Sequence, residues 1–439
     1  MEKQLATWQN FASTDAHSVG ADLRSFASVE TLINELRPAV PVHCVRPAPL
    51  QDAAQWFLRN FPGKVLYAVK CNPEPATLRY LTQAGITHFD VGSLNEMRLV
   101  RRVAPFAQLH FMHPVKNRAA IREAYFKFGV RDFVLDSREE LQKIIEATNA
   151  ATDLRLHVRL AIPRGVAQHE LVSKFGALPA LAIELLQAAD KIAAKVGLCF
   201  HVGSQCLHPE AYRRGILLAA QVAKKSGVAI DILDIGGGFP AAYPGSTIPP
   251  LARYIEAIKA ALVEIALPAT TEVWCEPGRA LVAEAGSLIV QVELRKGDAL
   301  YINDGVYGSL FDAGILNNRY PVKLLRASGS EHKAAFKSFK LFGPTCDSID
   351  VMRGPYVLPE DVVEGDWLEI GQLGAYCTSM RSQFNGLSGE SITVEVWDEP
   401  LLRMPDYQPK TDRRVVRPDT VFNLNMLLQR REERETEMN

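Results

Sequence analysis

Lys70 is the residue whose placement most clearly suggests chemistry. It follows a short apolar run, residues 65–69, that has the composition of a β-strand, and Asn72-Pro73 then interrupts regular structure. A lysine is costly to bury unless it is paired or has reacted, and a lysine joined to an aldehyde cofactor as an imine has reacted. The placement therefore suggests pyridoxal 5'-phosphate (PLP) chemistry. The alternative is a solvated lysine after an edge strand. The YAVK sequence, taken alone, would favour that alternative.

Polar residues also follow the other strand-like runs of the chain. They are Asp90, His113, Asp136, Arg159, His201, Gly236, Gly237, Gly238 and Glu276. Three successive glycines let backbone N–H groups turn toward one point, which favours a phosphate site over a merely flexible turn. An imidazole such as His201 could lie flat against a cofactor ring, with the nearby Ser204 hydroxyl on the phosphate. A histidine hydrogen-bonded at the start of a loop is the plainer interpretation.

The EPGR segment offers a carboxylate and a guanidinium. Glu276 could pair with the pyridine nitrogen of PLP and raise its pKa, which makes the ring a strong electron sink. Gly278 and Arg279 follow, and Arg279 could bind the phosphate or a carboxylate. A turn with a surface ion pair would also explain this segment.

Two later segments add a thiol, a carboxylate and a phenol. Cys346 could return a proton to Cα, and Asp347 could bind a substrate amine. An isolated pair of this kind is more often a buried cysteine beside a capping aspartate. Tyr376 could reach the phosphate or simply pack in the core.

The elements that must position these residues alternate regularly. Strand-like runs occur at 65–69, 87–91, 108–112, 131–135, 154–160, 197–202, 231–235 and 271–275, with helical patterns between them. This alternation predicts an α/β fold, a (β/α)8 barrel of the TIM type over residues 41–280, with an open doubly wound sheet as the alternative. Period-two runs after residue 280 predict a mostly antiparallel β domain from residues 281–402 together with 1–40. Residues 403–439 form a C-terminal extension, either a solvated helix or disordered.

Composition excludes several classes of protein. The net charge of −1 argues against a nucleic-acid or membrane-surface partner, and no apolar stretch is long enough to span a membrane. The start of the chain lacks an apolar signal core. The 7 cysteines have no C-x-x-C spacing, so we expect reduced thiols in the cytoplasm and neither a disulfide framework nor a metal site.

Taken together, the motifs resemble a known family. YAVKCNP, FDVGS, SKFG, HVGSQ, DIGGGFP, EPGR, GPTCDSID, GAYCTSM and FNGL occur in the order found in fold-type III PLP-dependent decarboxylases, in the ornithine/lysine decarboxylase branch with an alanine-racemase-type barrel. The resemblance covers roughly residues 35–390, and its joint pattern is more specific than any single motif.

The resemblance implies a role for each matching residue. Lys70 would form the internal aldimine, Cys346 would protonate the quinonoid intermediate, and Asp347, with Tyr307 and Asp312 nearby, would face the substrate. The cofactor site would comprise Asp90, Glu96, Arg159, His201, Ser204, Gly236, Gly237, Gly238, Glu276, Gly278, Arg279 and Tyr376. The family's Cys-Asp pair comes from the partner subunit, which implies a homodimer with shared active sites and makes Lys174 a candidate for an intersubunit ion pair.

The segment after DGVYGS departs from the family pattern. Ornithine and lysine decarboxylases usually carry a further acidic residue there, where this chain has Leu316 followed by Asn317, Asn318 and Arg319. Asp312 is the nearby carboxylate, offset by about one helical turn. The resemblance thus implies L-ornithine or L-lysine as substrate. D-ornithine, D-lysine, a diaminopimelate-like substrate or a less basic amino acid stays open.

Other classes sharing parts of this pattern are disfavoured by particular residues. A diaminopimelate decarboxylase would carry Cys-Glu in place of Cys346-Asp347, and a racemase would carry an arginine where Glu276 stands. A non-enzymatic regulator would have lost Lys70 or the three glycines. A small PLP carrier would lack the β domain.

Overall fold

The computed structural model describes residues 23–162, 167–169, 174–316, 318–327, 334–387 and 391–407, and for 167–169 the backbone only. Residues up to Tyr407 belong to one compact unit. The first 22 residues and most of the predicted C-terminal extension lie outside the described ranges. Among the described residues, no helix is both long enough and apolar enough to cross a membrane.

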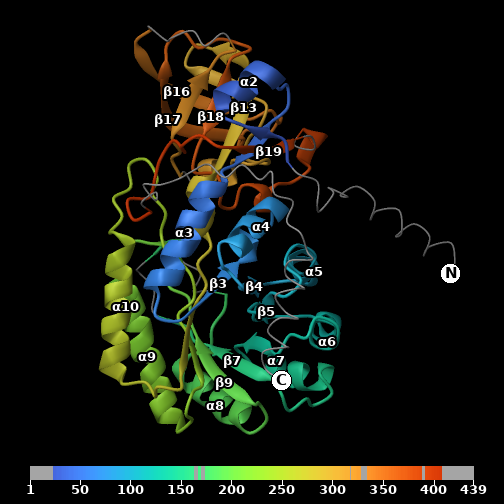
Figure 1. Cartoon of the computed structure of the whole chain (residues 1–439), viewed down its shortest axis with the longest axis vertical. Helices are drawn as coiled ribbons and strands as arrows, with labels where there is room; N and C mark the ends of the chain where they lie inside the picture. Colours follow the sequence, from blue (N-terminus) through green and yellow to red (C-terminus); the bar gives the residue numbers. More distant parts are fainter. Residues whose placement is uncertain are drawn as a thin grey trace, which may run out of the picture. The chain divides into compact units, whose positions relative to one another are not determined.

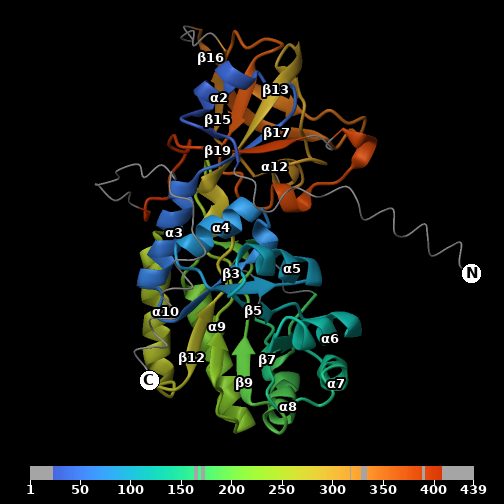
Figure 2. The ribbon, with the colours of Figure 1, turned by 45° about the vertical axis from the view of Figure 1, so that its right-hand side comes forward.

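Eight parallel strands close into a barrel, as the alternation predicts (Figures 1 and 2). They are β3 (Lys64–Ala68), β4 (His88–Val91), β5 (Gln108–Phe111), β6 (Asp132–Leu135), β7 (Arg155–Arg159), β9 (Lys195–Cys199), β11 (Ile232–Asp234) and β12 (Glu272–Cys275). Closure between β12 and β3 confirms the barrel over the open sheet.

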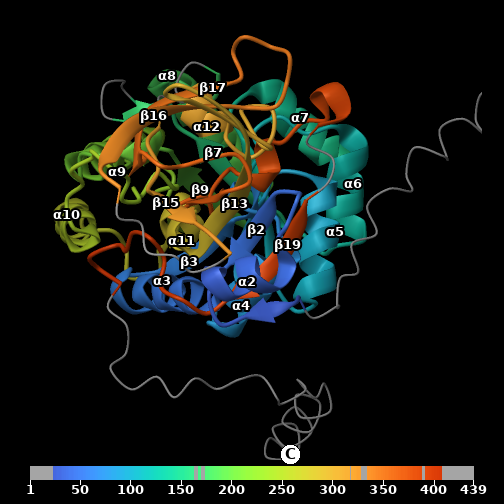
Figure 3. The same ribbon diagram turned by 90° about the horizontal axis from the view of Figure 1, so that it is seen from above.

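Helices surround these strands, as the view from above shows (Figure 3). They are α3 (Pro47–Asn60), α4 (Pro75–Gln83), α5 (Leu94–Val103), α6 (Arg118–Phe126), α7 (Arg138–Ala147), α8 (Pro179–Asp190), α9 (Glu210–Ser226) and α10 (Leu251–Ile265). Local sequence sets several of their starts. Ser93 and Ser137 accept hydrogen bonds from backbone N–H groups three residues later, while α3, α4 and α8 begin with proline.

A second sheet, mixed but largely antiparallel, is built from both ends of the described chain. Its strands are β1 (Ser25–Phe26), β2 (Val42–Val45), β13 (Gly286–Lys296), β14 (Ala299–Ile302), β15 (Val322–Leu325), β16 (Phe336–Phe342), β17 (Val351–Pro359), β18 (Trp367–Ile370) and β19 (Ile392–Val396). Helix α2 (Val29–Leu36) lies between its first two strands in the chain. The β1–β19, β2–β19 and β14–β16 pairs are parallel.

Strand β2 differs from the expected domain boundary. It pairs with β13 and β19 of the second sheet, although its residues fall within the range 41–280 assigned to the barrel. A run of four buried apolar or weakly polar residues carries no signal for which sheet it joins. The barrel strands therefore begin with β3, and α3 connects the two sheets along the chain.

The short elements that shape the barrel mouth follow the strand ends. A 3-10 turn (Val69–Cys71) follows β3, and a two-stranded ribbon joins β8 (Ala167–His169) to β10 (Ser204–Cys206). Helix α11 (Arg279–Val282) follows β12, and helix α12 (Phe311–Gly314) lies between β14 and β15. These short elements carry four of the residues that the sequence predicts for the site, Lys70, Ser204, Arg279 and Asp312.

The barrel interior contains charged and polar groups where small barrels usually hold branched apolar side chains. Asp132 is fully buried and lies 2.9 Å from both His110 Nδ1 and His157 Nε2. The Trp274 ring packs 4.8 Å from His110, across the barrel from β12 to β5. Gly197 leaves space for His157, because a Cβ there would lie 2.6 Å from its Nδ1. This polar layer was not foreseen in the sequence.

Candidate active site

Lys70 lies just beyond β3 and pairs with the carboxylate at the end of β4. Its Nζ donates to Asp90 Oδ2 at 2.8 Å, and the lysine side chain is 51% exposed while that of Asp90 is buried. Burial disfavours the charged amine, but the Asp90 and Glu276 carboxylates hold the pKa of Lys70 above its ordinary value. The amine therefore stays at the barrel mouth as a cation with one acidic partner.

Glu276 is paired with a second carboxyl group, Asp234 at the end of β11. The two carboxyl groups perturb each other's titration, and burial raises the pKa of both. Burial raises the pKa of Glu276 well above its ordinary value, and the neighbouring Asp234 and Asp90 charges add to the rise. Asp234 is anchored by the Gly236 N–H at 2.8 Å. The pair can hold one shared proton or take up a cationic partner such as a protonated pyridine nitrogen.

The three glycines form a tight turn, the glycine cradle, that packs directly against neighbouring backbone and has no room for side chains. A Cβ at Gly236 would lie 2.2 Å from the Phe200 carbonyl oxygen, and one at Gly238 would lie 2.2 Å from the Gly203 carbonyl oxygen. Both glycines have φ in the left-handed region, at 69° and 94°. A cradle of this kind, bordered by backbone N–H groups, fits a phosphate group.

His201 borders the same cradle. A Cβ at Gly237 would lie 3.2 Å from its Nε2, and its Nδ1 accepts the Gly203 N–H at 3.0 Å. Burial, followed by the charges of Arg159 and Lys70, lowers the pKa of His201 well below its ordinary value. The ring is therefore neutral and fixed by its loop, as a ring that stacks on a flat cofactor should be.

Arg279 is held in a buried cluster with Tyr243, Asp312 and Tyr376. Its Nη1 donates to the Tyr243 hydroxyl at 2.8 Å and its Nη2 donates to Asp312 Oδ2 at 3.2 Å. Its Nε is buried without a hydrogen-bond partner among the described residues, and its guanidinium carbon lies 4.9 Å from the Tyr376 ring centroid. Burial opposes the charge of Arg279, but Tyr243 and Asp312 hold its pKa well above the ordinary value. Asp312 therefore lies against Arg279.

Cys346 and Asp347 occupy an exposed loop of the second sheet. The Cys346 thiol lies 3.5 Å from Asn385 Oδ1, and Asp347 accepts a hydrogen bond from the Tyr307 hydroxyl. That hydrogen bond lowers the pKa of Asp347. Asp350 fixes both loops, because its Oδ1 accepts the Val306 N–H at 2.7 Å and its Oδ2 accepts the Thr345 N–H at 3.0 Å. Within the described part of the chain, the hydrogen bonds and ion pairs of this loop do not reach Lys70.

The remaining predicted residues border the barrel mouth in looser arrangements. Glu96 accepts the Gly92 N–H at 2.6 Å, and burial raises its pKa. The Arg159 guanidinium and the His113 ring both pack on Phe175, at 5.6 and 5.5 Å. Lys174 lies over the same ring.

Two further residues and one segment complete the comparison of the predicted site with the structure. Ser204 begins β10, and Gly278 packs so closely that a Cβ there would lie 3.0 Å from the Cβ of Cys71. In the segment that departs from the family pattern, Leu316 and Arg319 are exposed, and Asn317 lies outside the described residues.

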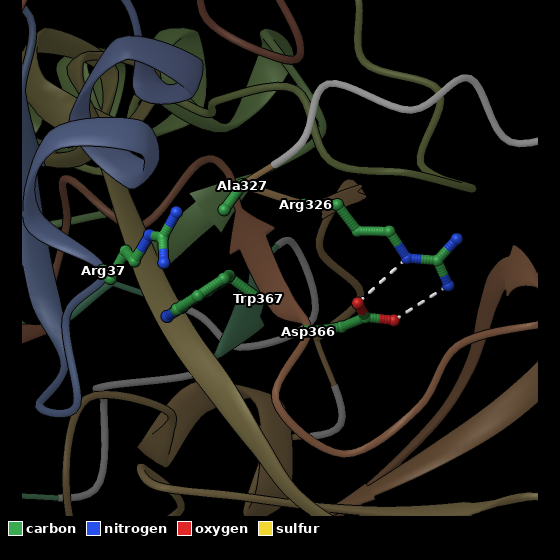
Figure 4. Close-up of a pocket in the computed structure, with 5 residues that line it drawn as sticks. All are labelled: Arg37, Arg326, Ala327, Asp366 and Trp367. Atoms are coloured by element: carbon green, nitrogen blue, oxygen red, sulfur yellow. Dashed lines mark hydrogen bonds and ion pairs between the residues drawn. The ribbon is translucent and has the colours of Figure 1, made fainter.

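Sequence reasoning missed Asp234, Tyr243, Asn385 and Asp350 as organisers of the site. Asp234 directly precedes the three glycines, so its place at the end of a strand was a usable signal. Tyr243 and Asn385 act through contacts made only after folding. A separate hollow of about 330 Å³ lies in the second sheet, lined by Arg37, Arg326, Ala327, Asp366 and Trp367 (Figure 4). It includes no predicted site residue, and Arg326 and Asp366 form an ion pair with each other there.

The residues at the barrel mouth fit PLP. The Arg279 Nε is a buried donor that has no acceptor among the described residues. The three glycines pack against His201 and the Glu276 backbone, and the Glu276 N–H donates to the Gly236 carbonyl at 2.9 Å. Glu276 can meet a pyridine nitrogen, while Lys70, paired with Asp90, offers an amine.

Comparison with known proteins agrees with this fit. Residues 48–283 match the family model described as "Pyridoxal-dependent decarboxylase, pyridoxal binding domain". The chain therefore belongs to the fold-type III, PLP-dependent ornithine/lysine decarboxylase family.

Individual relatives carry different activities in their names. A lysine/ornithine decarboxylase of Selenomonas ruminantium is 34% identical over 77% of this chain and 85% of its own length. Antizyme inhibitor 2 of Xenopus laevis is 33% identical over 83% of each chain. The crystal structure of the arginine decarboxylase of Paramecium bursaria Chlorella virus superposes with a TM-score of 0.75 at 26% identity, over 84% of this chain and 99% of that one.

Proposed function

We propose that this chain is a PLP-dependent decarboxylase that removes CO2 from a basic amino acid, L-ornithine or L-lysine. The observation that carries the proposal is that the Lys70–Asp90 pair, the buried Glu276 carboxyl group and the three glycines packed against Glu276 and His201 all follow strands of one barrel. Bound PLP supplies the electron sink that accepts the electrons of the broken Cα–carboxylate bond.

The chain's own residues have separate tasks in this proposal. Lys70 would hold the cofactor aldehyde through its amine, and Asp90, whose Oδ2 lies 2.8 Å from the Lys70 Nζ, keeps that amine oriented. Glu276 would hold a proton or a hydrogen bond at the ring nitrogen, and the neutral His201 ring would exclude water from one face. Cys346 delivers the proton to Cα after CO2 has left.

The distal end of the substrate is the part that decides specificity. Asp347, held by Tyr307, provides a carboxylate for a terminal ammonium group. Asp312 lies against Arg279, and Leu316 stands where a second acid is usual, so the described residues supply one carboxylate there. A site with one carboxylate for the distal group also suits a second candidate function, the decarboxylation of a less basic or D-configured amino acid.

We also propose a homodimer in which each subunit completes the other's site. Cys346 is exposed, and exposed apolar side chains surround it on neighbouring turns, with Ile349 48%, Phe384 40% and Leu387 48% exposed. An apolar patch around a predicted catalytic thiol is expected to be covered by a second copy. The 7 free cysteines, 6 of them buried, are compatible with a cytoplasmic location, which stays a prediction.

The test is CO2 release by the PLP-loaded protein with L- and D-ornithine, lysine, arginine and diaminopimelate, with Lys70→Ala as the control. Turnover of ornithine or lysine would support the first candidate. CO2 release only from a D-amino acid or from diaminopimelate would favour the second candidate. No release from any of these amino acids, despite lysine-bound cofactor absorbance, would refute decarboxylation of a basic amino acid.

Shared sites have a separate test. Lys70→Ala and Cys346→Ala are each expected to be inactive alone. If each site combines Lys70 of one subunit with Cys346 of the other, about half of the randomly mixed dimers carry one intact site, so mixing should restore about a quarter of the wild-type activity. Mixtures that stay inactive after subunit exchange would refute the shared site.

A further inference from the structure

Asp312 is the counter-ion of a buried arginine. The Asp312 and Arg279 side chains are 9% and 5% exposed, and Oδ2 lies 3.2 Å from Nη2. They belong to different short helices, Asp312 to α12 and Arg279 to α11. Arg279 is the only partner that the hydrogen bonds and ion pairs of the described residues give to the Asp312 carboxylate. Its place therefore differs from the expected position beside a substrate amine.

One hydrogen-bond donor of Arg279, its Nε, is not used by the described part of the protein. Nη1 is used by Tyr243 and Nη2 by Asp312, whereas the buried Nε has no acceptor in the described part of the chain. A buried donor left without an acceptor costs about 1–3 kcal/mol, so the group is expected to meet one when a ligand binds. A guanidinium with a free N–H suits an anion with several acceptor oxygens, such as the cofactor phosphate of the proposed function.

The charge balance makes Asp312 unusual at such a site. A buried guanidinium without a counter-ion would be strongly unfavourable, and Asp312 removes that penalty while the anion is absent. The same negative charge repels an arriving anion, because Asp312 and that anion share one guanidinium. Tyr243, the other partner of Arg279, is neutral and has no such effect.

We propose that Asp312 is a built-in counter-ion of the phosphate cradle, which neutralises Arg279 in the cofactor-free protein and weakens the grip of the cradle on the cofactor phosphate. This rests on the proposed function insofar as the anion is the phosphate of PLP. Asp312 is then a positioning residue of the cofactor site. Cofactor exchange should therefore be easier in this chain than in a site where the arginine has no carboxylate partner.

Asp312→Asn tests the charge alone, since the amide oxygen can still accept from Nη2. The dissociation constants of PLP and of pyridoxal, which lacks the phosphate, are measured by titrating the cofactor-free protein. One unit charge at several Å in a partly buried site is expected to matter by at least about tenfold. The ratio of PLP affinity to pyridoxal affinity should therefore rise at least about tenfold in the variant.

Tyr243→Phe is the matched control, because it removes the other polar partner of Arg279 without changing the charge. Its affinity ratio should not rise. Inorganic phosphate provides a second readout, since it should raise the Tm of the cofactor-free Asp312→Asn protein more than that of the wild type. If Asp312→Asn does not fold, Asp312→Ser takes its place with the same expectation.

Three results would overturn the inference. The first is an unchanged ratio of PLP affinity to pyridoxal affinity in Asp312→Asn, and the second is a lower ratio. The third is an unchanged ratio together with a higher KM for the amino-acid substrate, which would assign Asp312 to the substrate. Wild-type protein that binds neither PLP nor pyridoxal would instead refute the proposed function. Wild-type protein that binds both while the ratio stays fixed would refute only this inference.

Discussion

The polar layer inside the barrel leads to a sharp prediction about stability, tested by Asp132→Asn. Asp132 is fully buried, and its carboxylate contacts His110 and His157 at 2.9 Å and Arg155 at 2.5 Å. Burial opposes the carboxylate charge, but the two histidines hold the pKa of Asp132 far below its ordinary value. Asparagine keeps the shape but removes the negative charge that pairs with Arg155, and it leaves one oxygen instead of two to accept from the two histidines.

The magnitude follows from what the partners lose. Removing one member of a buried ion pair costs about 3–5 kcal/mol, because the remaining charges stay buried without compensation. Arg155 is partly exposed, with 27% of its side chain accessible, and can turn toward water, so we expect the lower half of that range. Asp132→Asn should therefore reduce the free energy of unfolding by about 3 kcal/mol and lower the urea midpoint.

Asp153→Asn is the matched control at the surface. Asp153 pairs with Arg131 and accepts from Tyr125, but its side chain is 53% exposed. An exposed pair of this kind contributes about 0–1 kcal/mol. Urea unfolding of both variants, followed by far-UV circular dichroism and tryptophan fluorescence, gives the comparison. Equal midpoints for the two variants would refute the view that the layer is a stabilising network.

Three further predictions concern the cradle, the distal carboxylate and acid stability. Gly237→Ala should weaken PLP binding at least about tenfold, measured by cofactor titration, because its Cβ would lie 2.4 Å from the Glu276 backbone oxygen. Tyr307→Phe should raise the pKa of Asp347 and so shift the acid limb of kcat/KM to higher pH, because the phenol now lowers that pKa; an unshifted limb would count against the assignment. Burial lowers the pKa of His43 to about 3. The contribution of the neutral His43 ring to the free energy of unfolding is therefore present above about pH 6.5 and is lost as pH falls. The wild type should lose about 2 kcal/mol more stability than His43→Gln between pH 7 and pH 5 in urea unfolding, and parallel losses would contradict this.

Much of the fold could be predicted because the barrel signal is local and repeated. Each strand is a short apolar run, and each polar residue that follows it must lie at the same open end. This is why Lys70, Asp90 and Glu276, far apart in the chain, could be placed around one point from the sequence. Helices also fall between these strands, as the alternation predicts.

The misplaced features depend on partners that only folding brings together. Strand β2 looks like any short buried strand, and its sheet is decided by β13 and β19, which come hundreds of residues later. The His110, Asp132 and His157 positions alternate with apolar neighbours, yet their mutual contact depends on the register between β5, β6 and β7.

Asp312 shows most clearly where sequence reasoning ends. Its distance along the chain from DGVYGS suggested a place near the substrate, because the family usually carries a substrate-binding acid in that segment. Folding instead brings α12 and α11 together so that the Asp312 carboxylate meets Arg279. The position of one acidic residue in the sequence therefore does not reveal its partner. A substrate ammonium group and a buried guanidinium group can both pair with the same carboxylate. Under the proposed function, Asp347 is then the one acid among the described residues for the substrate's terminal group, and the affinity ratio of Asp312→Asn tests whether Asp312 serves Arg279 instead of the substrate.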